Sequence, residues 1–283
     1  MKKIISVLCL CLPLLAYADC NDDANKLRES GRVDEAIAVL DNCLQQEKNR
    51  LARTYLLLGI SHYQKGEQQQ AIASYTKAIE ASPDYAVAYT NRGLSHAVAG
   101  NLDKAVSDLD HALQLAPDYA KAWYFRAFTL HLKGDYQQAI EDYTHALDTT
   151  DDDVVKALAY HRRGLARANI GKKEQALSDY DNALERDPSF APAYFSRALY
   201  YQHAEEYDAA IADYSRVIEL DPDNEKAVYN RGLLYKEAGK DYLAIQDYHK
   251  ALALKPSYTR AHASLAIARF IPLLPILLVA MLG

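Results

Sequence analysis

Apolar residues return along most of the chain at positions three or four residues apart, in a pattern that repeats every 34 residues. Each repeat holds two such apolar sets, and a glycine lies between them. Residues three and four apart share one face of an α-helix, so each set predicts one amphipathic helix. We therefore expect a pair of antiparallel helices in every repeat. Each pair can bury its apolar faces only against its neighbours.

Proline and glycine mark where these helices should end. With the proline of each repeat set at position 32, the chain has Pro83, Pro117, Pro188, Pro222 and Pro256. At position 15, where the first helix should end in a left-handed residue, it has Gly31, Gly66, Gly100, Gly134, Gly171 and Gly239. Glu205 takes this place in the sixth repeat, which predicts mild backbone strain there.

Small and large side chains recur at positions that would let the two helices of a repeat approach closely. Position 20 is always alanine, and position 8 is a glycine in four repeats: Gly59, Gly93, Gly164 and Gly232. Position 24 carries a large side chain: Tyr75, Leu109, Tyr143, Tyr180, Tyr214 or Tyr248. We expect these large side chains to fill the space between the helices.

This order of aromatic residue, glycine or alanine, alanine, aromatic residue, alanine and proline resembles the tetratricopeptide repeat family. Stretches such as Tyr229 to Gly232 and Asp142 to Leu147 read like members of it. The resemblance implies an all-α fold, a right-handed superhelical solenoid of antiparallel helix pairs. It divides the chain into seven repeats: 19–51, 52–85, 86–119, 120–156, 157–190, 191–224 and 225–258.

Two repeats depart from the pattern. The first lacks its proline and has Lys48 in that place. The fourth has Asp151 there, within a run of extra residues from Thr149 to Asp153, so the stack is expected to kink or loosen at this point.

The amino-terminal residues predict export. Lys2 and Lys3 precede an apolar run that ends in Ala-Tyr-Ala at Ala18, and small residues at these places are what a signal peptidase reads. We interpret residues 1–18 as a signal peptide for the bacterial periplasm or cell envelope. Lipidation at Cys20 is an alternative, although the acidic residue before it argues against that reading.

After this cleavage the chain would keep two cysteines, Cys20 and Cys43, in an oxidising compartment. They take positions 4 and 27 of the first repeat, which face each other across a helix pair. We expect a disulfide bond between them, worth about 3 kcal/mol. The alternative is a pair of small buried side chains.

The carboxyl end is apolar. Residues 259–269 continue in phase and are expected to form the capping helix that such arrays need. Residues 270–283 carry no charged or polar side chain. As a helix they would span about 21 Å, less than the roughly 30 Å of a hydrocarbon core. A membrane anchor, packing on the last repeat or on a partner, and a disordered end all stay open.

No catalytic arrangement stands out. The nine histidines are scattered, and no pair has the spacing that holds a metal on one helix face. Glu141 and His145 fit a helix-surface pair, and Asp151 to Asp153 lacks the spaced ligands of a calcium loop. Loss of the signal peptide would change the formal net charge from −6 to −8, which disfavours nucleic acid. We predict no enzyme activity, no metal and no cofactor.

Arginine recurs at position 7: Arg92, Arg126, Arg163, Arg197 and Arg231. The strict phase suggests a structural ladder rather than a ligand site. The expected partners are Asp108, Asp142, Asp179, Asp213 and Asp247.

The resemblance places partner binding on an inner groove lined by first-helix positions 2, 5, 6, 9, 12 and 13. The candidate groove residues are Tyr63, Asn91, Tyr124, Phe125, Phe128, His131, His161, Arg162, Phe195, His203, Tyr229, Asn230 and Lys236. Such an aromatic groove suits an apolar or extended peptide segment, although some of these rings could instead pack between repeats. The carboxylate clamp of chaperone-binding members is absent, because position 9 is never asparagine.

These observations predict a non-enzymatic scaffold or adaptor of the cell envelope that binds a protein or peptide partner. Two alternatives stay open. One is a membrane-tethered assembly factor that uses the apolar tail, and the other is an enzyme whose site matches no motif considered above.

Overall fold

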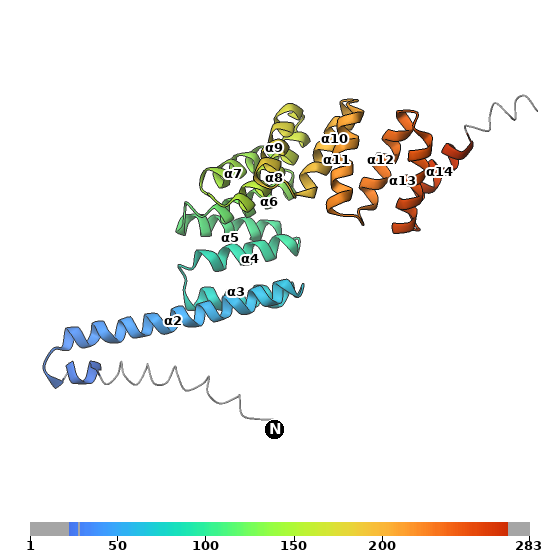
Figure 1. Cartoon of the computed structure of the whole chain (residues 1–283). Coiled ribbons are helices and arrows are strands. Elements are labelled where there is room, and N and C mark those ends of the chain that lie inside the picture. Colours follow the sequence, from blue (N-terminus) through green and yellow to red (C-terminus); the bar gives the residue numbers. More distant parts are fainter. Residues whose placement is uncertain (1–22, 28, 271–283) are drawn as a thin grey trace, which may run out of the picture. The chain divides into compact units, whose positions relative to one another are not determined.

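The computed structural model describes residues 23–27 and 29–270, and every regular element in these ranges is a helix, which confirms the all-α fold (Figure 1). A short helical stretch at 23–27 comes first. The helices that follow are α2 (Val33–Gln64), α3 (Gln68–Ala81), α4 (Ala86–Val98), α5 (Leu102–Leu115), α6 (Ala120–Lys133), α7 (Tyr136–Asp148), α8 (Asp153–Asn169), α9 (Lys173–Arg186), α10 (Ala191–His203), α11 (Tyr207–Leu220), α12 (Glu225–Glu237), α13 (Asp241–Leu254) and α14 (Thr259–Phe270).

The chain forms two compact units, Met1–Pro117 and Asp118–Gly283. In the N-terminal unit, α3 packs on α2, and α4 packs on both α3 and α5. In the C-terminal unit, the pairs are α6 with α7, α8 with α9, α10 with α11, and α12 with α13 (Figure 1). The last helix, α14, packs on α13 at the place expected for the capping helix, and it buries Ala261, Leu265 and Ala268.

A close contact inside a helix pair joins position 8 of the first helix to the ring at position 24 of the second. A Cβ atom added to Gly164 would lie 2.6 Å from a ring carbon of Tyr180, and one added to Gly232 would lie 2.9 Å from a ring carbon of Tyr248. Carbon atoms do not approach so closely without displacement. The predicted filling of this space by the large side chains is therefore confirmed.

The first helix of a pair ends in a left-handed residue, as predicted. Gly134, for example, has φ +89° at the end of α6. Glu205 has φ +61° at the equivalent turn after α10 and is the one residue other than glycine with positive φ among those described. A side chain in this conformation costs about 1 kcal/mol or more.

The arginines of position 7 form the predicted ladder. Arg92 donates to both carboxylate oxygens of Asp108 at 2.8 and 2.7 Å, and Arg231 does the same to Asp247 at 2.8 Å. The remaining Nη1 reaches the second helix of the preceding repeat, as in Arg231 to Ser215 Oγ at 3.0 Å. Hydrogen bonding to the aspartate, against the effect of burial, raises the pKa of Arg92 and of Arg231. Arg92, Arg163, Arg197 and Arg231 therefore each tie three helices together.

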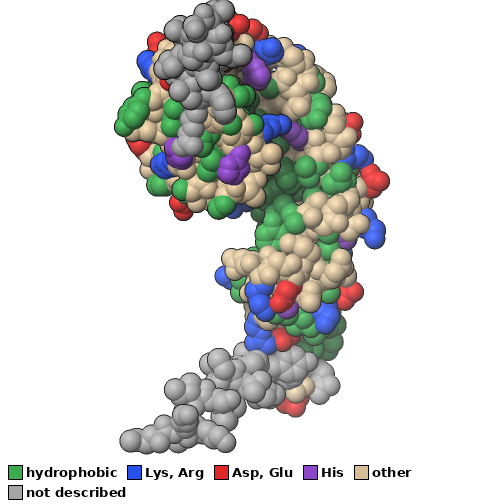
Figure 2. Space-filling model, turned by 90° about the vertical axis from the view of Figure 1, so that its right-hand side faces the viewer, with side chains coloured by type: hydrophobic (Ala, Val, Ile, Leu, Met, Phe, Trp, Pro, Cys, Tyr) green, Lys and Arg blue, Asp and Glu red, His purple; other side chains and the backbone are tan. Residues whose placement is uncertain are grey.

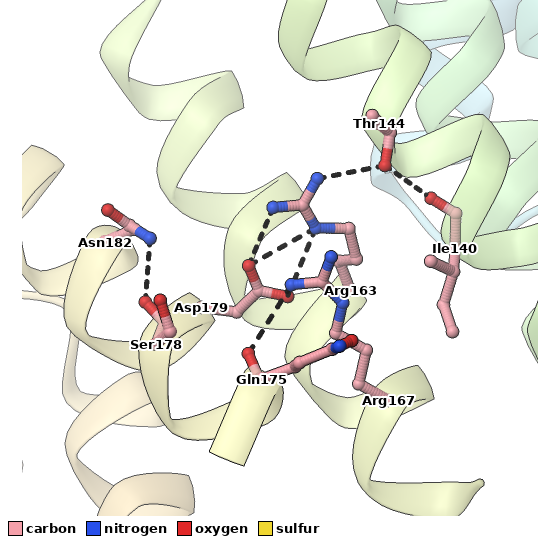
Figure 3. A network of polar contacts seen from close by, with 8 residues as sticks. All are labelled: Ile140, Thr144, Arg163, Arg167, Gln175, Ser178, Asp179 and Asn182. Carbon is pink, nitrogen blue, oxygen red and sulfur yellow. Dashed lines mark hydrogen bonds and ion pairs between the residues drawn. The ribbon is translucent and has the colours of Figure 1, made fainter. Parts of the chain in front are cut away.

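The densest part of the ladder lies around Asp179 on α9 (Figure 3). Arg163 Nη2 and Arg167 Nη1 donate to this carboxylate at 2.8 and 2.7 Å, and Arg163 Nη1 donates to Thr144 Oγ1 at 2.9 Å. The side chain of Asp179 is 1% exposed. Burial is the main cause that lowers the pKa of Arg167, while Asp179 opposes that fall.

The boundary expected between the first and second repeats falls inside α2, which runs for 32 residues without a break. No turn therefore separates the predicted repeats 19–51 and 52–85. A proline would stop the helix by removing a donor and clashing with the preceding turn, and Lys48 does neither. The second helix of the first repeat and the first helix of the second are therefore one helix.

The extra residues of the fourth repeat do not loosen the stack, in contrast to the prediction. Asp152 Oδ1 accepts hydrogen bonds from the backbone N–H of Val154 at 2.9 Å and of Val155 at 3.4 Å. This cap starts α8 early, so α8 has 17 residues and still packs on α7.

Replacing Glu205 with glycine should stabilise the protein by about 1 kcal/mol, because glycine adopts positive φ at little cost. Urea unfolding followed by circular dichroism measures the change. The matched control is Glu206→Gly, since Glu206 has φ −82° and gains nothing from glycine there. Equal effects of the two substitutions would contradict the assignment of strain to Glu205.

Asp179→Ala should destabilise the C-terminal unit by about 3–4 kcal/mol, because Arg163 and Arg167 would be left largely buried without their carboxylate. Thermal and urea unfolding report the loss. Glu185→Ala, at an exposed position of the same helix, should change stability by less than about 0.5 kcal/mol. A small effect of Asp179→Ala would mean that the ladder contributes little.

Candidate functional site

The C-terminal unit has a pocket of about 410 Å³ between α8, α10 and the start of α9, which we call the α8–α10 pocket. Its walls are mainly apolar, and charged or titratable side chains join them at Lys173, Glu174 and His203. The remaining lining residues are Leu165, Ala168, Ala176, Tyr180, Ser196, Leu199, Tyr200 and Ala204. Pockets of this size and composition suit one or two large apolar side chains.

A second pocket, of about 360 Å³, lies on the other side of Ser196 and is called the α10–α12 pocket. Ser196 lines both pockets, and its hydroxyl lies 3.0 Å from His161 Nε2. The other lining residues are His161, Ala191, Pro192, Phe195, Asp221, Asn224 and Lys226. The two pockets therefore adjoin along one face of α10.

Several predicted groove residues of α6 lie close to Arg162 of α8. Its guanidinium lies 5.3 Å from the centre of the Phe128 ring, a cation–π distance. Burial raises the pKa of Tyr124, and the charge of Arg162 opposes that rise. Burial, followed by the same charge, lowers the pKa of His131. We call Tyr124, Phe128, His131 and Arg162 the Arg162 cluster.

Two polar atoms near this cluster have no hydrogen-bond partner among the described residues. They are Nδ1 of His131 and the hydroxyl of Tyr143, and both are buried. The Tyr124 ring lies 5.7 Å from the Tyr143 ring, and the His131 ring meets Tyr136 edge-on at 5.1 Å. The α6 side of the Arg162 cluster therefore combines aromatic packing with two buried polar atoms.

Two predicted groove residues are buried, although His161 also lines the α10–α12 pocket. His161 is 6% exposed and meets the Phe190 ring edge-on at 5.2 Å, while Tyr229 is 7% exposed and packs on Tyr248 and Tyr258. Burial lowers the pKa of His161 to about 4, so its ring is neutral at neutral pH. Both rings therefore pack against rings of their own repeat, and His161 Nε2 also lies 3.0 Å from Ser196 Oγ of the next repeat.

Other predicted residues already have partners of their own. Phe195 lines the α10–α12 pocket, yet its ring packs edge-on against Tyr214 at 5.5 Å. Asn230 donates to the Tyr214 hydroxyl at 3.1 Å, and Lys236 pairs with Asp241 at 2.6 Å. Phe125 meets the Tyr124 ring edge-on at 5.3 Å.

Tyr63 and Asn91 belong to the N-terminal unit and are half-buried. Burial raises the pKa of Tyr63, and the Asn91 amide donates to Val87 O at 2.8 Å. The structure therefore brings together the four residues of the Arg162 cluster and places His203 in the α8–α10 pocket. Phe125 contacts the Tyr124 ring of the cluster, and His161 and Phe195 line the α10–α12 pocket. The remaining predicted residues lie elsewhere or pack in the core.

Most of the α8–α10 pocket was not predicted. Leu165 and Leu199 stand at position 9, a groove position, but the prediction favoured aromatic and polar side chains there. Lys173 and Glu174 start the second helix of their repeat, outside the groove positions considered. The small side chain of Ala168 at position 12 was the feature of the sequence that could have indicated this pocket.

Several predictions concern residues outside those described. Cys20 lies outside, so the disulfide with Cys43 stays a prediction, as do the signal peptide at 1–18 and the tail from residue 271 onward. None of the described helices combines the length and apolar composition that a membrane crossing requires. Within the described ranges, no group of His, Cys, Asp or Glu side chains is arranged to hold a metal ion.

On the face shown in Figure 2, acidic and basic side chains are interspersed.

Solved structures similar to this chain share its fold. A chain of the APC/C hetero-tetramer Cut9-Hcn1 is 21% identical with a TM-score of 0.66; the match covers 91% of this chain but 48% of that one, so this chain spans about half its length. PilF of Pseudomonas aeruginosa is 18% identical with a TM-score of 0.70, covering 78% of this chain and 99% of its own. YrrB, described as a TPR protein with an unusual peptide-binding site, is 25% identical with a TM-score of 0.53, covering 67% and 96%.

A sequence comparison with curated proteins gives no match. Family profiles match most of the chain. Profiles described as TPR repeat match residues 59–97 and 204–239, and profiles described as tetratricopeptide repeat match 90–154, 157–190, 179–212 and 225–258. With the helix pairs and their ladder, these matches show that the chain belongs to the tetratricopeptide repeat family, whose fold is a scaffold for protein–protein interaction.

Proposed function

We propose that this chain is an adaptor that binds a partner protein by taking a large apolar side chain of a peptide or helix into the α8–α10 pocket. The observation that carries the proposal is the pocket itself, with about 410 Å³ of space and walls from Leu165, Leu199 and Tyr200. A buried apolar anchor in such a pocket commonly supplies much of the binding free energy of an interface.

Polar groups around the pocket would fix the direction of the bound segment. Lys173 and Glu174 stand at the start of α9 and His203 stands at the end of α10, so hydrogen-bonding groups of both kinds reach the rim. The main chain of a partner segment offers matching donors and acceptors. This arrangement of apolar walls and a polar rim is typical of specific recognition.

The Arg162 cluster extends this site toward α6. Arg162 and Leu165 are three residues apart on α8, so they share one helix face. A segment anchored in the pocket and running toward α6 would meet the guanidinium and the Phe128 ring, which suits a carboxylate or an aromatic side chain. YrrB, with its peptide-binding site, supports peptide binding as a use of this fold.

Filling the pocket should abolish this binding without disturbing the fold. Ala168 is exposed and lines the pocket, so Ala168→Trp places an indole in the space that the partner's side chain needs. Peptides selected on the wild-type chain from a random library should bind the variant at least tenfold more weakly. Fluorescence anisotropy with labelled peptides measures the difference.

The matched control is Ala212→Trp, at an exposed position on α11 that does not line this pocket. It should bind the same peptides with unchanged affinity, and circular dichroism should show equal helicity in both variants. If Ala168→Trp binds as well as wild type, the α8–α10 pocket is not the site. Selected peptides should also contain a recurrent large apolar residue.

We also propose that the adaptor works in the bacterial cell envelope, on the grounds of the signal-like residues 1–18. Expressed in a Gram-negative host, the chain should be recovered from the periplasm or envelope with a new amino terminus after Ala18.

The apolar run 270–283 supports the alternative role of a membrane-tethered assembly factor. Truncation after Arg269 should then move the protein from the membrane fraction to the soluble fraction. Unprocessed protein in the cytoplasm would contradict export, and an unchanged distribution would contradict the anchor.

A further inference from the structure

Helix α2 carries an apolar stripe that the described part of its unit leaves exposed. The exposed fractions of its side chains are far above those of the core, and we call these residues the α2 stripe: Val33 50%, Ile37 51%, Leu40 36%, Leu44 49%, Leu51 47% and Leu58 45%. Between Ala36 and Ala52, all of which the structure describes, α2 has no buried residue. An exposed apolar surface of this kind marks an interaction site.

The spacing of the α2 stripe is that of a coiled-coil seam. Its members follow one another at intervals of four, three, four, seven and seven residues, so they occupy a and d positions of consecutive heptads. At 3.6 residues per turn the six side chains fall within about 60° of the helix circumference. From Val33 to Leu58 the stripe is about 39 Å long at 1.5 Å per residue.

The contacts of α2 with its own unit use other faces. Ala52, Leu56 and Gly59 form the buried side of its carboxy-terminal half, at the contact with α3. On the helical wheel this side is centred about 100° away from the stripe. The ring of Tyr75 on α3 lies against Gly59 and does not reach the stripe. Ala36 is buried on the other side of the stripe, and among the described residues the stripe itself stays exposed while α2 packs on α3.

We propose that the α2 stripe is a self-association surface on which α2 of a second copy of this chain lies antiparallel, as a two-helix coiled coil. In this alignment Leu40 packs beside Leu51 of the second copy, and Val33 packs beside Leu58 of the second copy. The two copies use the same surface, as a twofold axis requires. Every apolar residue of the stripe is then covered by the other helix.

The charges beside the stripe fit this antiparallel alignment. Asp41 and Lys48 both occupy e positions, and an antiparallel pair brings Asp41 of each copy beside Lys48 of the other. The twofold axis makes two such pairs. A parallel alignment would instead place Glu47 directly opposite Glu47 of the second copy in the seam, and like charges there are destabilising. In the antiparallel alignment Glu47 faces Leu44 of the second copy and keeps its pair with Arg50 at 2.6 Å.

The first test compares two leucines of equal exposure. Leu44 lies in the stripe and Leu132 lies on α6, and both are 49% exposed. Sedimentation velocity of the full chain over a concentration series should show a reversible dimer. Leu44→Glu should raise its dissociation constant at least hundredfold, and Leu132→Glu should leave it unchanged. A wild-type chain that stays monomeric at every soluble concentration overturns the proposal, as does an equal effect of the two substitutions.

The second test exchanges the charges and changes no buried residue. Asp41→Lys and Lys48→Asp should each weaken the dimer by about tenfold, because each creates two like-charge contacts. The double variant Asp41→Lys/Lys48→Asp recreates both pairs and should restore the wild-type dissociation constant. A double variant as weak as the single variants overturns the antiparallel pairing. Circular dichroism should show equal helicity in all three.

Discussion

The structure depends on the contact between the large side chain at position 24 and the backbone at position 8 of the same repeat. In the pair of α8 and α9, the Tyr180 ring occupies the space that a Cβ on Gly164 would need. The residue before each partner is a member of the ladder, Arg163 before Gly164 and Asp179 before Tyr180. Because the ring contact fixes the helix separation, it also holds the guanidinium and the carboxylate at 2.8 Å. Packing therefore provides the geometry that makes a largely desolvated ion pair favourable.

The pair of α2 and α3 shows that the ring contact does not depend on the ladder. It keeps the ring contact between Gly59 and Tyr75, but Leu58 and Ser74 replace the arginine and the aspartate. Close packing thus forms without the ladder, and the ladder begins one pair later, between α4 and α5. At the position where later repeats have a paired arginine, this repeat has Leu58, which is 45% exposed and lies at the end of the α2 stripe. The loss of one structural ion pair supplies part of an apolar surface.

The fold could be predicted from the sequence because the same residue types recur at the same positions of each repeat. Helix ends, ring contacts and ladder partners could be assigned by phase, and Glu205 could be identified as strained. The groove was harder to predict. His161 fits a groove position, yet Phe190 covers it from the end of the same repeat. The α8–α10 pocket exists where Ala168 and Ala204 leave space, and a search for aromatic binding residues does not find a hollow made by small ones. Helix α2 is continuous because Lys48 stands where other repeats have proline. The sequence marks the missing proline, but whether the helix then continues depends on packing along its whole length.

The junction between α7 and α8 suggests how arrays of this kind change in length. The added residues lie on the surface, and Asp152 satisfies the backbone N–H groups of the next helix without help from a neighbouring repeat. Such a junction tolerates further residues because the start of α8 does not depend on the length of the connection before it. Residues 149–151 are therefore a natural place to insert a reporter peptide or a protease site. The connection before α8 can therefore change in length while the helices on either side keep their register.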